Sequence, residues 1–203
     1  MISALLLAAG QGSRMNYQAK ALLSLGHTTF VQHALQQLAD AGMDEIILVT
    51  GAQRGAVWGA AVQQAADDSV QRPPLREAHN PNYQTGILSS IQTGLQAVHP
   101  QSEAVLITLV DLPFLKAEDY RAASDHWRCG DAYTLLRAWS EGQPAHPVII
   151  PLAYFSQIME QPPSDKGCSF LFKKYPERVR FHEVARGRID IDTIEDYHAH
   201  ITS

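Results

Sequence analysis

The chain has 203 residues, of which 45% are hydrophobic and 18% charged, and it contains 13 Gly and 11 Pro. This composition is typical of a globular domain and excludes collagen-like, coiled-coil and disordered classes. The 16 Lys and Arg against 21 Asp and Glu give a formal net charge of −5. Proteins that bind double-stranded nucleic acid usually carry a basic excess, so we expect no nucleic-acid partner. The negative net charge does not exclude the binding of small anionic ligands, because basic residues can cluster locally.

Targeting signals are weak. The longest apolar run, residues 4–9, is too short to cross a bilayer, so we expect no membrane partner. No Lys or Arg precedes that run, and a glycine loop follows it where a signal peptide would have a cleavage site. Cys129 and Cys168 stand far apart and outside any paired-cysteine motif. These features predict a cytoplasmic protein with reduced thiols and no zinc site.

Short apolar runs alternate with helical patterns along the chain. In the second element, Val31, Leu35 and Leu38 share one helical face, and Thr28 or Thr29 can cap it. The run at 104–110 is continuously apolar, as expected for a strand covered on both faces. In chain order, we expect strand 3–9, helix 30–41, strand 45–50, helix 54–66, strand 75–79, helix 86–98, strand 104–110, helix 117–127, strands 131–138, 147–150 and 179–184, and helix 194–201.

This alternation predicts a single α/β domain over residues 1–203. Repeated strand–helix units favour a mostly parallel sheet with helices on both sides. The pattern is less regular after residue 130, so the sheet is expected to be mixed. The predicted architecture is a three-layer α/β/α, Rossmann-like fold.

A glycine loop directly follows the first strand. Gly10 and Gly12 allow a sharp turn and a close approach to a ligand, and consecutive N–H groups in such a turn form an anion nest. Arg14 and Lys20 add cations that suit phosphate oxygens. The dinucleotide fingerprint would need a glycine where Met15 stands, and the Walker pattern is absent as well. On these residues alone, a plain tight turn with two surface cations is an equal alternative.

The whole stretch resembles the MobA-like nucleotidyltransferase family. The resemblance lies in Leu-Ala-Ala-Gly-Gln-Gly-Ser-Arg-Met at 7–15 and Ala-Lys-Ala-Leu-Leu at 19–23. Asn16 replaces the family's last glycine and Ala19 its proline, and the Ala-Ala-Gly form is similar to the molybdopterin cytidylyltransferase branch. The resemblance implies the fold of nucleotide-diphospho-sugar transferases. It also implies that the loop wraps a nucleoside triphosphate through Ala8, Ala9, Gly10, Gly12, Ser13, Arg14 and Lys20.

A second block opens the helix expected at 86–98. Residues 80–91 resemble the family's Asn-x-x-x-x-x-Gly-Met-x-Ser-Ser-Leu segment. The resemblance implies nucleoside contacts from Asn80, Gly86, Ser89 and Ser90, near a helix start that has free N–H groups. The alternative is ordinary helix capping by Thr85, with the serines facing solvent.

Two carboxylates are candidates for a magnesium site. Asp111 follows the most apolar strand, and ligands of open α/β sheets bind at the carboxyl ends of their strands. Asp is a hard oxygen ligand that suits Mg²⁺ beside substrate phosphates. The resemblance adds Asp192, from Asp-Ile-Asp-Thr at 190–193. The alternatives are a turn at Asp111 and a helix cap made by Asp192 with Glu195.

The acceptor half of the resemblance is less complete. Gln-Pro-Ala-His-Pro-Val at 143–148 is similar to the family's Gly-His-Pro-Val, which implies an acceptor contact from His146. Asp190 is the second acceptor candidate. If residues 187–192 are extended, Asp190 and Asp192 point to the same side, and Ile189 and Ile191 face the core. Residues 164–169 resemble Gly-Asp-x-Gly-Ala-Arg, but Ser169 stands where that motif has arginine.

The resemblance implies an enzyme that transfers a nucleoside monophosphate from CTP to molybdopterin and releases pyrophosphate with Mg²⁺. Arg14, Lys20 and Asp111 are its expected catalytic residues. The resemblance also implies a molybdoenzyme or its chaperone as a protein partner. Three alternatives remain: a sugar-phosphate or other small-acceptor nucleotidyltransferase, a catalytically inactive nucleotide-binding regulator, and an NAD-dependent oxidoreductase, which the absent third glycine disfavours.

Overall fold

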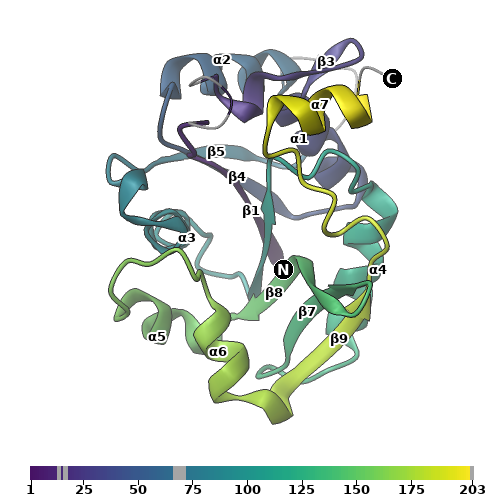
Figure 1. Cartoon of the computed structure of the whole chain (residues 1–203). Helices are drawn as coiled ribbons and strands as arrows, with labels where there is room; N and C mark the ends of the chain where they lie inside the picture. The colour runs from purple at the N-terminus through teal and green to yellow at the C-terminus, as the bar shows by residue number, and fades with distance from the viewer. Residues whose placement is uncertain (13–14, 16–17, 66–71, 202–203) are drawn as a thin grey trace.

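A seven-stranded mixed sheet runs through the middle of the molecule (Figure 1). The computed structural model describes residues 1–12, 15, 18–65 and 72–201. The sheet has the strand order β5-β4-β1-β6-β8-β7-β9. Its strands are β1 (Ile2–Ala8), β4 (Glu45–Thr50), β5 (Leu75–His79), β6 (Ala104–Leu109), β7 (Leu135–Ser140), β8 (Gln143–Pro151) and β9 (Val179–Glu183). A small separate hairpin joins β2 (Ser24–Leu25) to β3 (Thr28–Thr29).

The pairing of the strands confirms the expected mixed, mostly parallel sheet. Strands β5, β4, β1 and β6 are mutually parallel, as the strand–helix alternation predicts. Strand β8 is antiparallel to both β6 and β7, and β9 returns parallel to β7. The carboxyl ends of β1 and β6 therefore lie side by side, which brings the glycine loop next to Asp111.

Helices cover both faces of the sheet and form two separate apolar cores (Figure 1). Along β1, Ala4 and Leu6 pack into one core while Leu5 and Leu7 pack into the other. This alternation explains why the strand reads as continuously apolar. The first core is covered by α1 (Phe30–Asp40), α2 (Arg54–Ala65), α4 (Ala117–Arg128) and α7 (Ile194–Ile201), and the second by α3 (Ile87–Leu95), α5 (Phe155–Met159) and α6 (Ser169–Lys174).

Several boundaries differ from the sequence-based expectation for local reasons. Residues 131–134 form a turn in which Thr134 N donates to Asp131 O over 3.0 Å, so the strand expected at 131–138 begins at Leu135. Strand β8 begins earlier than expected, at Gln143, despite the prolines at its start. Proline lowers the expectation of a strand because it donates no ladder hydrogen bond. The short α5, α6 and the β2–β3 hairpin are too brief for periodicity to reveal.

The carboxyl-terminal segment returns to the site. Helix α7 packs beside α1, where the rings of Phe30 and Tyr197 lie 6.3 Å apart, and Tyr197 donates to Ser24 O over 2.8 Å. Ile191 N donates to Asp111 O over 2.9 Å. These contacts bring residues 190–192 to the end of β6.

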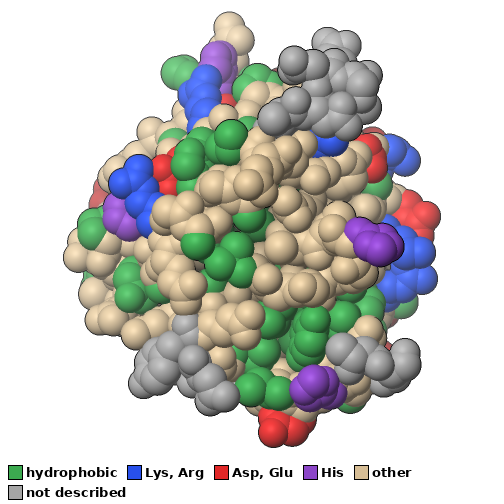
Figure 2. Space-filling model, turned by 90° about the horizontal axis from the view of Figure 1, so that it is seen from above, with side chains coloured by type: hydrophobic (Ala, Val, Ile, Leu, Met, Phe, Trp, Pro, Cys, Tyr) green, Lys and Arg blue, Asp and Glu red, His purple; other side chains and the backbone are tan. Residues whose placement is uncertain are grey.

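Charge is spread thinly over the surface seen from above. On this face the charged side chains lie mainly at the periphery, and uncharged side chains and backbone occupy the centre (Figure 2). Within the described part of the chain, every helix is too short or too polar to cross a membrane.

Candidate active site

A cavity of about 420 Å³ opens where the first strand ends. The predicted residues that line it are Ala8, Ala9, Gly10, Gly12, Lys20, Gly86, Ser90 and Asp111. Gly12 has a φ of 62°, and a Cβ there would collide with the carbonyl of Gln18, so the turn requires glycine. Ser13 and Arg14 lie outside the described residues, and their roles stay predictions.

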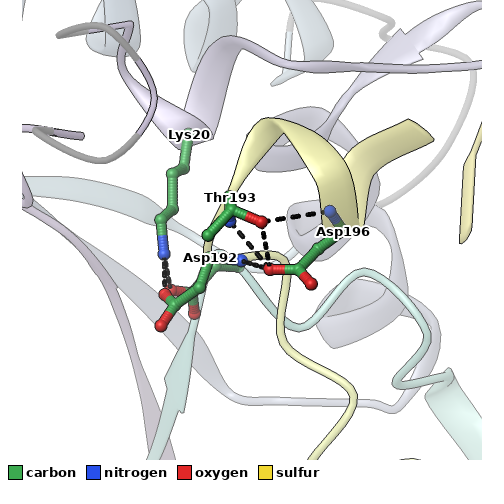
Figure 3. Close-up of polar contacts among 5 residues, drawn as sticks. Lys20, Asp192, Thr193 and Asp196 are labelled. Carbon is green, nitrogen blue, oxygen red and sulfur yellow. Dashed lines mark hydrogen bonds and ion pairs between the residues drawn. The ribbon is translucent and has the colours of Figure 1, made fainter. Parts of the chain in front are cut away.

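Lys20 joins two carboxylates that are distant in sequence. Its Nζ lies 2.9 Å from Asp111 Oδ2, and it also contacts Asp192 Oδ1 (Figure 3). Burial would lower the pKa of Lys20, but the two carboxylates outweigh burial and raise it. Lys20 is therefore a firmly charged ammonium group at the wall of the cavity. The structure thus brings Lys20, Asp111 and Asp192 together.

A different pair of residues caps the final helix. Thr193 Oγ1 accepts from Asp196 N over 3.1 Å, and Asp196 Oδ2 accepts from Thr193 N over 2.8 Å (Figure 3). This reciprocal pair is a capping box one residue further along than the expected pair of Asp192 and Glu195. Thr193 and Asp196 thus cap the helix, and the carboxylate of Asp192 contacts Lys20.

The carboxylates fit a magnesium ion that also binds substrate. Asp111 Oδ1 is buried and has no hydrogen-bond partner among the described residues, which leaves one oxygen for a further ligand. No group of three or more His, Cys, Asp or Glu in the described segments is arranged to hold a metal ion. Mg²⁺ typically uses one or two carboxylates and completes its shell with water and phosphate oxygens. Asp111 and Asp192 would hold such an ion, with the remaining ligands coming from the nucleotide.

The block before α3 forms a buried hydrogen-bond network. Asn80 Nδ2 donates to Ser89 Oγ over 2.9 Å and to Ser90 Oγ over 3.0 Å, and all three residues are buried. Ser89 Oγ also donates to Gly86 O over 2.8 Å. Ser90 and Gly86 line the cavity, but Asn80 and Ser89 do not. The network therefore fixes the start of α3, and nucleoside contacts from Asn80 and Ser89 stay a prediction.

Gly86 permits a close crossing of two segments. Its φ is 115°, and a Cβ there would lie 2.5 Å from Ser164 C and 2.9 Å from Asp165 N. Leu88 N donates to Ser164 O over 3.0 Å. One N–H at the start of α3 is thus used by the 164–169 loop, which forms one side of the cavity through Asp165.

The two acceptor candidates, His146 and Asp190, lie near the carboxylates. His146 is half-buried with Nδ1 3.4 Å from Ile107 O, and burial lowers its pKa. Partial burial and the carboxylates of Asp192 and Asp111 raise the pKa of Asp190. The chain turns over 185–188, which leaves Ile189 36% exposed while Ile191 is fully buried. The expectation that both isoleucines face the core is therefore only half correct.

Sequence reasoning missed Arg137. This residue lines a second cavity of about 200 Å³ together with His146 and Ser169. The available signal was a basic residue inside the otherwise uncharged segment Leu-Leu-Arg-Ala-Trp-Ser of β7.

Fold and site together define an α/β protein with a cavity at the carboxyl ends of the parallel strands of a mixed sheet, where a lysine contacts two aspartates. Residues 4–179 match the MobA-like NTP transferase domain, and the chain belongs to that family. The family's reaction class is nucleotidyl transfer from a nucleoside triphosphate.

Two relatives are similar to this chain over nearly its whole length. Nicotine blue oxidoreductase from Paenarthrobacter nicotinovorans is 26% identical over 201 residues, covering 96% of this chain and 93% of the relative. Molybdenum cofactor cytidylyltransferase from Escherichia coli K12 is 25% identical over 198 residues, covering 97% and 93%. Rv0371c from Mycobacterium tuberculosis H37Rv, solved in complex with manganese, shares the fold with a TM-score of 0.75 and 24% identity, over 100% of this chain and 98% of that one.

Proposed function

We propose that the chain transfers the cytidylyl group of CTP to the phosphate of molybdopterin in a Mg²⁺-dependent reaction. The observation that carries the proposal is the cluster of Lys20, Asp111 and Asp192, of which Lys20 and Asp111 line the first cavity. A buried carboxylate oxygen that has no partner in the described part of the chain, next to an ammonium group, suits a metal-bound triphosphate. The manganese complex of Rv0371c supports a divalent ion in a protein of this fold.

The chain's residues would act mainly by binding and orientation. The glycine loop, Arg14 and Lys20 would hold the triphosphate, and Asp111 and Asp192 would hold Mg²⁺. When bound, the ion neutralises negative charge on the triphosphate. An oxygen of the acceptor phosphate forms a bond to the α-phosphorus, the bond from the α-phosphorus to the bridging oxygen breaks, and pyrophosphate leaves. The acceptor phosphate is already anionic near neutral pH, so no strong general base is needed.

The choice of CTP and molybdopterin rests on narrower support. It depends on the Ala8-Ala9-Gly10 form of the loop, on residues 145–148 and on similarity to the Escherichia coli cytidylyltransferase. A molybdoenzyme or its chaperone would then be the protein that receives the product. A sugar phosphate or another small phosphorylated acceptor is compatible with the same cavity.

A second candidate, redox chemistry, is favoured by the similarity to nicotine blue oxidoreductase. A nicotinamide nucleotide is also an anionic ligand that a glycine loop can bind. Met15, which is 2% exposed, stands where the dinucleotide fingerprint has its third glycine, and this argues against such a cofactor. A catalytically inactive regulator would bind a nucleotide and turn over neither substrate.

Pyrophosphate release separates these functions. The purified chain is incubated with Mg²⁺, each of the four NTPs and either molybdopterin or a panel of sugar phosphates, while NADH and NADPH absorbance is followed in parallel. We expect pyrophosphate only with CTP and molybdopterin. A preference for GTP would contradict the cytidylyl assignment, and NAD(P)H oxidation without pyrophosphate would contradict nucleotidyl transfer.

A further inference from the structure

A second cavity adjoins the one assigned to the nucleotide. It has a volume of about 200 Å³ and shares Ile87 and Asp165 with the first cavity. Much of its wall is apolar, built from Ile91, Ile107 and Phe172 among others. The two cavities therefore form neighbouring compartments beside the same segment of α3.

Arg137 enters this cavity from β7. Its neighbours Leu136 and Ala138 are fully buried in the core under α1 and α4. Because successive residues of a strand point to opposite faces, Arg137 lies on the face covered by α3 and α6. The ladder between β7 and β8 shifts register between Arg137 and Ala138. Such irregularities redirect side chains and are common beside binding sites.

The guanidinium group of Arg137 lacks a counter-ion. Within the described part of the chain, it makes no hydrogen bond or ion pair, whereas Arg54 and Arg178 are each paired with a carboxylate. Its Cζ lies 4.8 Å from the centre of the Phe172 ring, and burial lowers its pKa. A partly buried cation without a partner is unfavourable unless a ligand supplies the opposite charge.

Other polar groups of the cavity do not replace Arg137 as an anion anchor. Burial lowers the pKa of His146, which therefore stays neutral near pH 7. Lys166 is exposed at the rim, and Ser169 carries no charge. The negative charges of Asp111 and Asp190 oppose this effect of burial on the pKa of His146, so both carboxylates lie near its ring. The cavity that His146 lines therefore lies near Asp111, one of the two carboxylates assigned to the metal.

We propose that Arg137 binds the phosphate of the acceptor, whose apolar body packs against the apolar wall of the second cavity. This proposal rests on the proposed function, because it names the residue that positions the acceptor at the same site. A guanidinium fork binds two oxygens of one phosphate at once, which fixes the direction as well as the position of the group. Ile87, Ile91 and Ile107 offer the surface for the apolar body.

Phenyl phosphate is a suitable probe, because it combines a planar ring with one phosphate. Its affinity is measured by calorimetry for the wild-type chain and for Arg137→Gln, Arg137→Lys and Arg180→Gln. Arg180 is an exposed residue of the adjacent strand β9, so its variant controls for the loss of one positive charge. We expect Arg137→Gln to weaken binding by about tenfold to a hundredfold, as for a lost hydrogen bond to a charged group. Arg137→Lys keeps the charge without the fork and should weaken binding by several-fold, and Arg180→Gln should bind as the wild type does.

CTP with Mg²⁺ is titrated into the same proteins as a separate readout. We expect CTP to bind equally to all four and not to displace phenyl phosphate. Loss of CTP binding in every protein would count against the proposed function and leave the Arg137 site standing. The acceptor proposal is overturned if Arg137→Gln binds phenyl phosphate like the wild type, if CTP displaces the probe, or if the wild-type chain does not bind it at millimolar concentration.

Discussion

Replacing Lys20 with methionine separates its electrostatic role from its role toward the nucleotide. Methionine keeps much of the apolar stem and removes the ammonium group. Asp111 Oδ2 and Asp192 Oδ1 both contact that group, so removing it leaves two carboxylates facing each other. The side chains of Lys20, Asp111 and Asp192 are 18%, 20% and 36% exposed, so water screens the repulsion only in part.

The size of the effect follows from this geometry. Two oxygens that share one ammonium group are about 5 Å apart, and two unit charges at this distance repel by about 3 kcal/mol at an effective dielectric constant of 20. Screening and small rearrangements reduce this, so we expect a loss of about 1–2 kcal/mol in the free energy of unfolding without metal. Mg²⁺ no longer competes with a bound ammonium group, so its affinity for the variant should rise by about tenfold or more.

Two assays on the same protein test this reasoning. Urea unfolding at pH 7 without metal gives the stability, and calorimetric titration with Mg²⁺ gives the affinity. Turnover of CTP should nevertheless fall by about a hundredfold or more, because a contact to the triphosphate is lost. Lys173→Met, at an exposed position of α6, is the matched control and should change none of the three. Unchanged stability together with unchanged Mg²⁺ affinity in Lys20→Met would refute the proposed charge balance.

Three further predictions follow from the same contacts. Asp111→Asn should keep the fold, because Ile191 bonds to the Asp111 backbone, and should abolish most turnover; near-normal activity at saturating Mg²⁺ would remove Asp111 from the metal site. Thr193→Ala should lower the free energy of unfolding by about 1 kcal/mol and preserve turnover, as urea unfolding and kinetics can show. Asp192→Ser should lower turnover and leave the free energy of unfolding nearly unchanged. Burial lowers the pKa of His33 and His182 in the folded chain, so the unfolded chain binds more protons below pH 6.5; stability should fall as pH drops from 7 to 5, and a flat urea midpoint would contradict this.

The sequence was most informative where hydrophobic pattern decides the structure. The buried run of β6 predicted both a central strand and the location of Asp111 at its carboxyl end. A strand that is covered on both faces needs apolar side chains at successive positions, so a continuous apolar run indicates a central strand. The meeting of Lys20 and Asp192 could not be predicted from spacing, since it depends on how α7 docks on α1. The family resemblance assigned Lys20 to the triphosphate and Asp192 to the metal, without a contact between them.

Local chemistry near the carboxyl terminus was harder to predict. Two overlapping capping boxes are possible at 192–196, and Thr193 with Asp196 forms the one observed. The choice depends on where the chain leaves the turn at 185–188 and how Ile191 bonds to Asp111. Arg137 was missed for a similar reason. The sequence of a short strand does not show which cavity a charged residue lines. For Arg137, the cavity is formed only when α6 packs against the sheet.

The most direct test of nucleotidyl transfer is a single-turnover experiment with CTP labelled at the α- or the γ-phosphorus. Wild-type chain and Asp111→Asn are each mixed with Mg²⁺, molybdopterin and one labelled CTP, and the products are separated after quenching. We expect the α-label to move into the acceptor and the γ-label into pyrophosphate in the wild type, with neither product formed by Asp111→Asn. An α-label that stays in CTP or appears only as free CMP would contradict transfer to this acceptor.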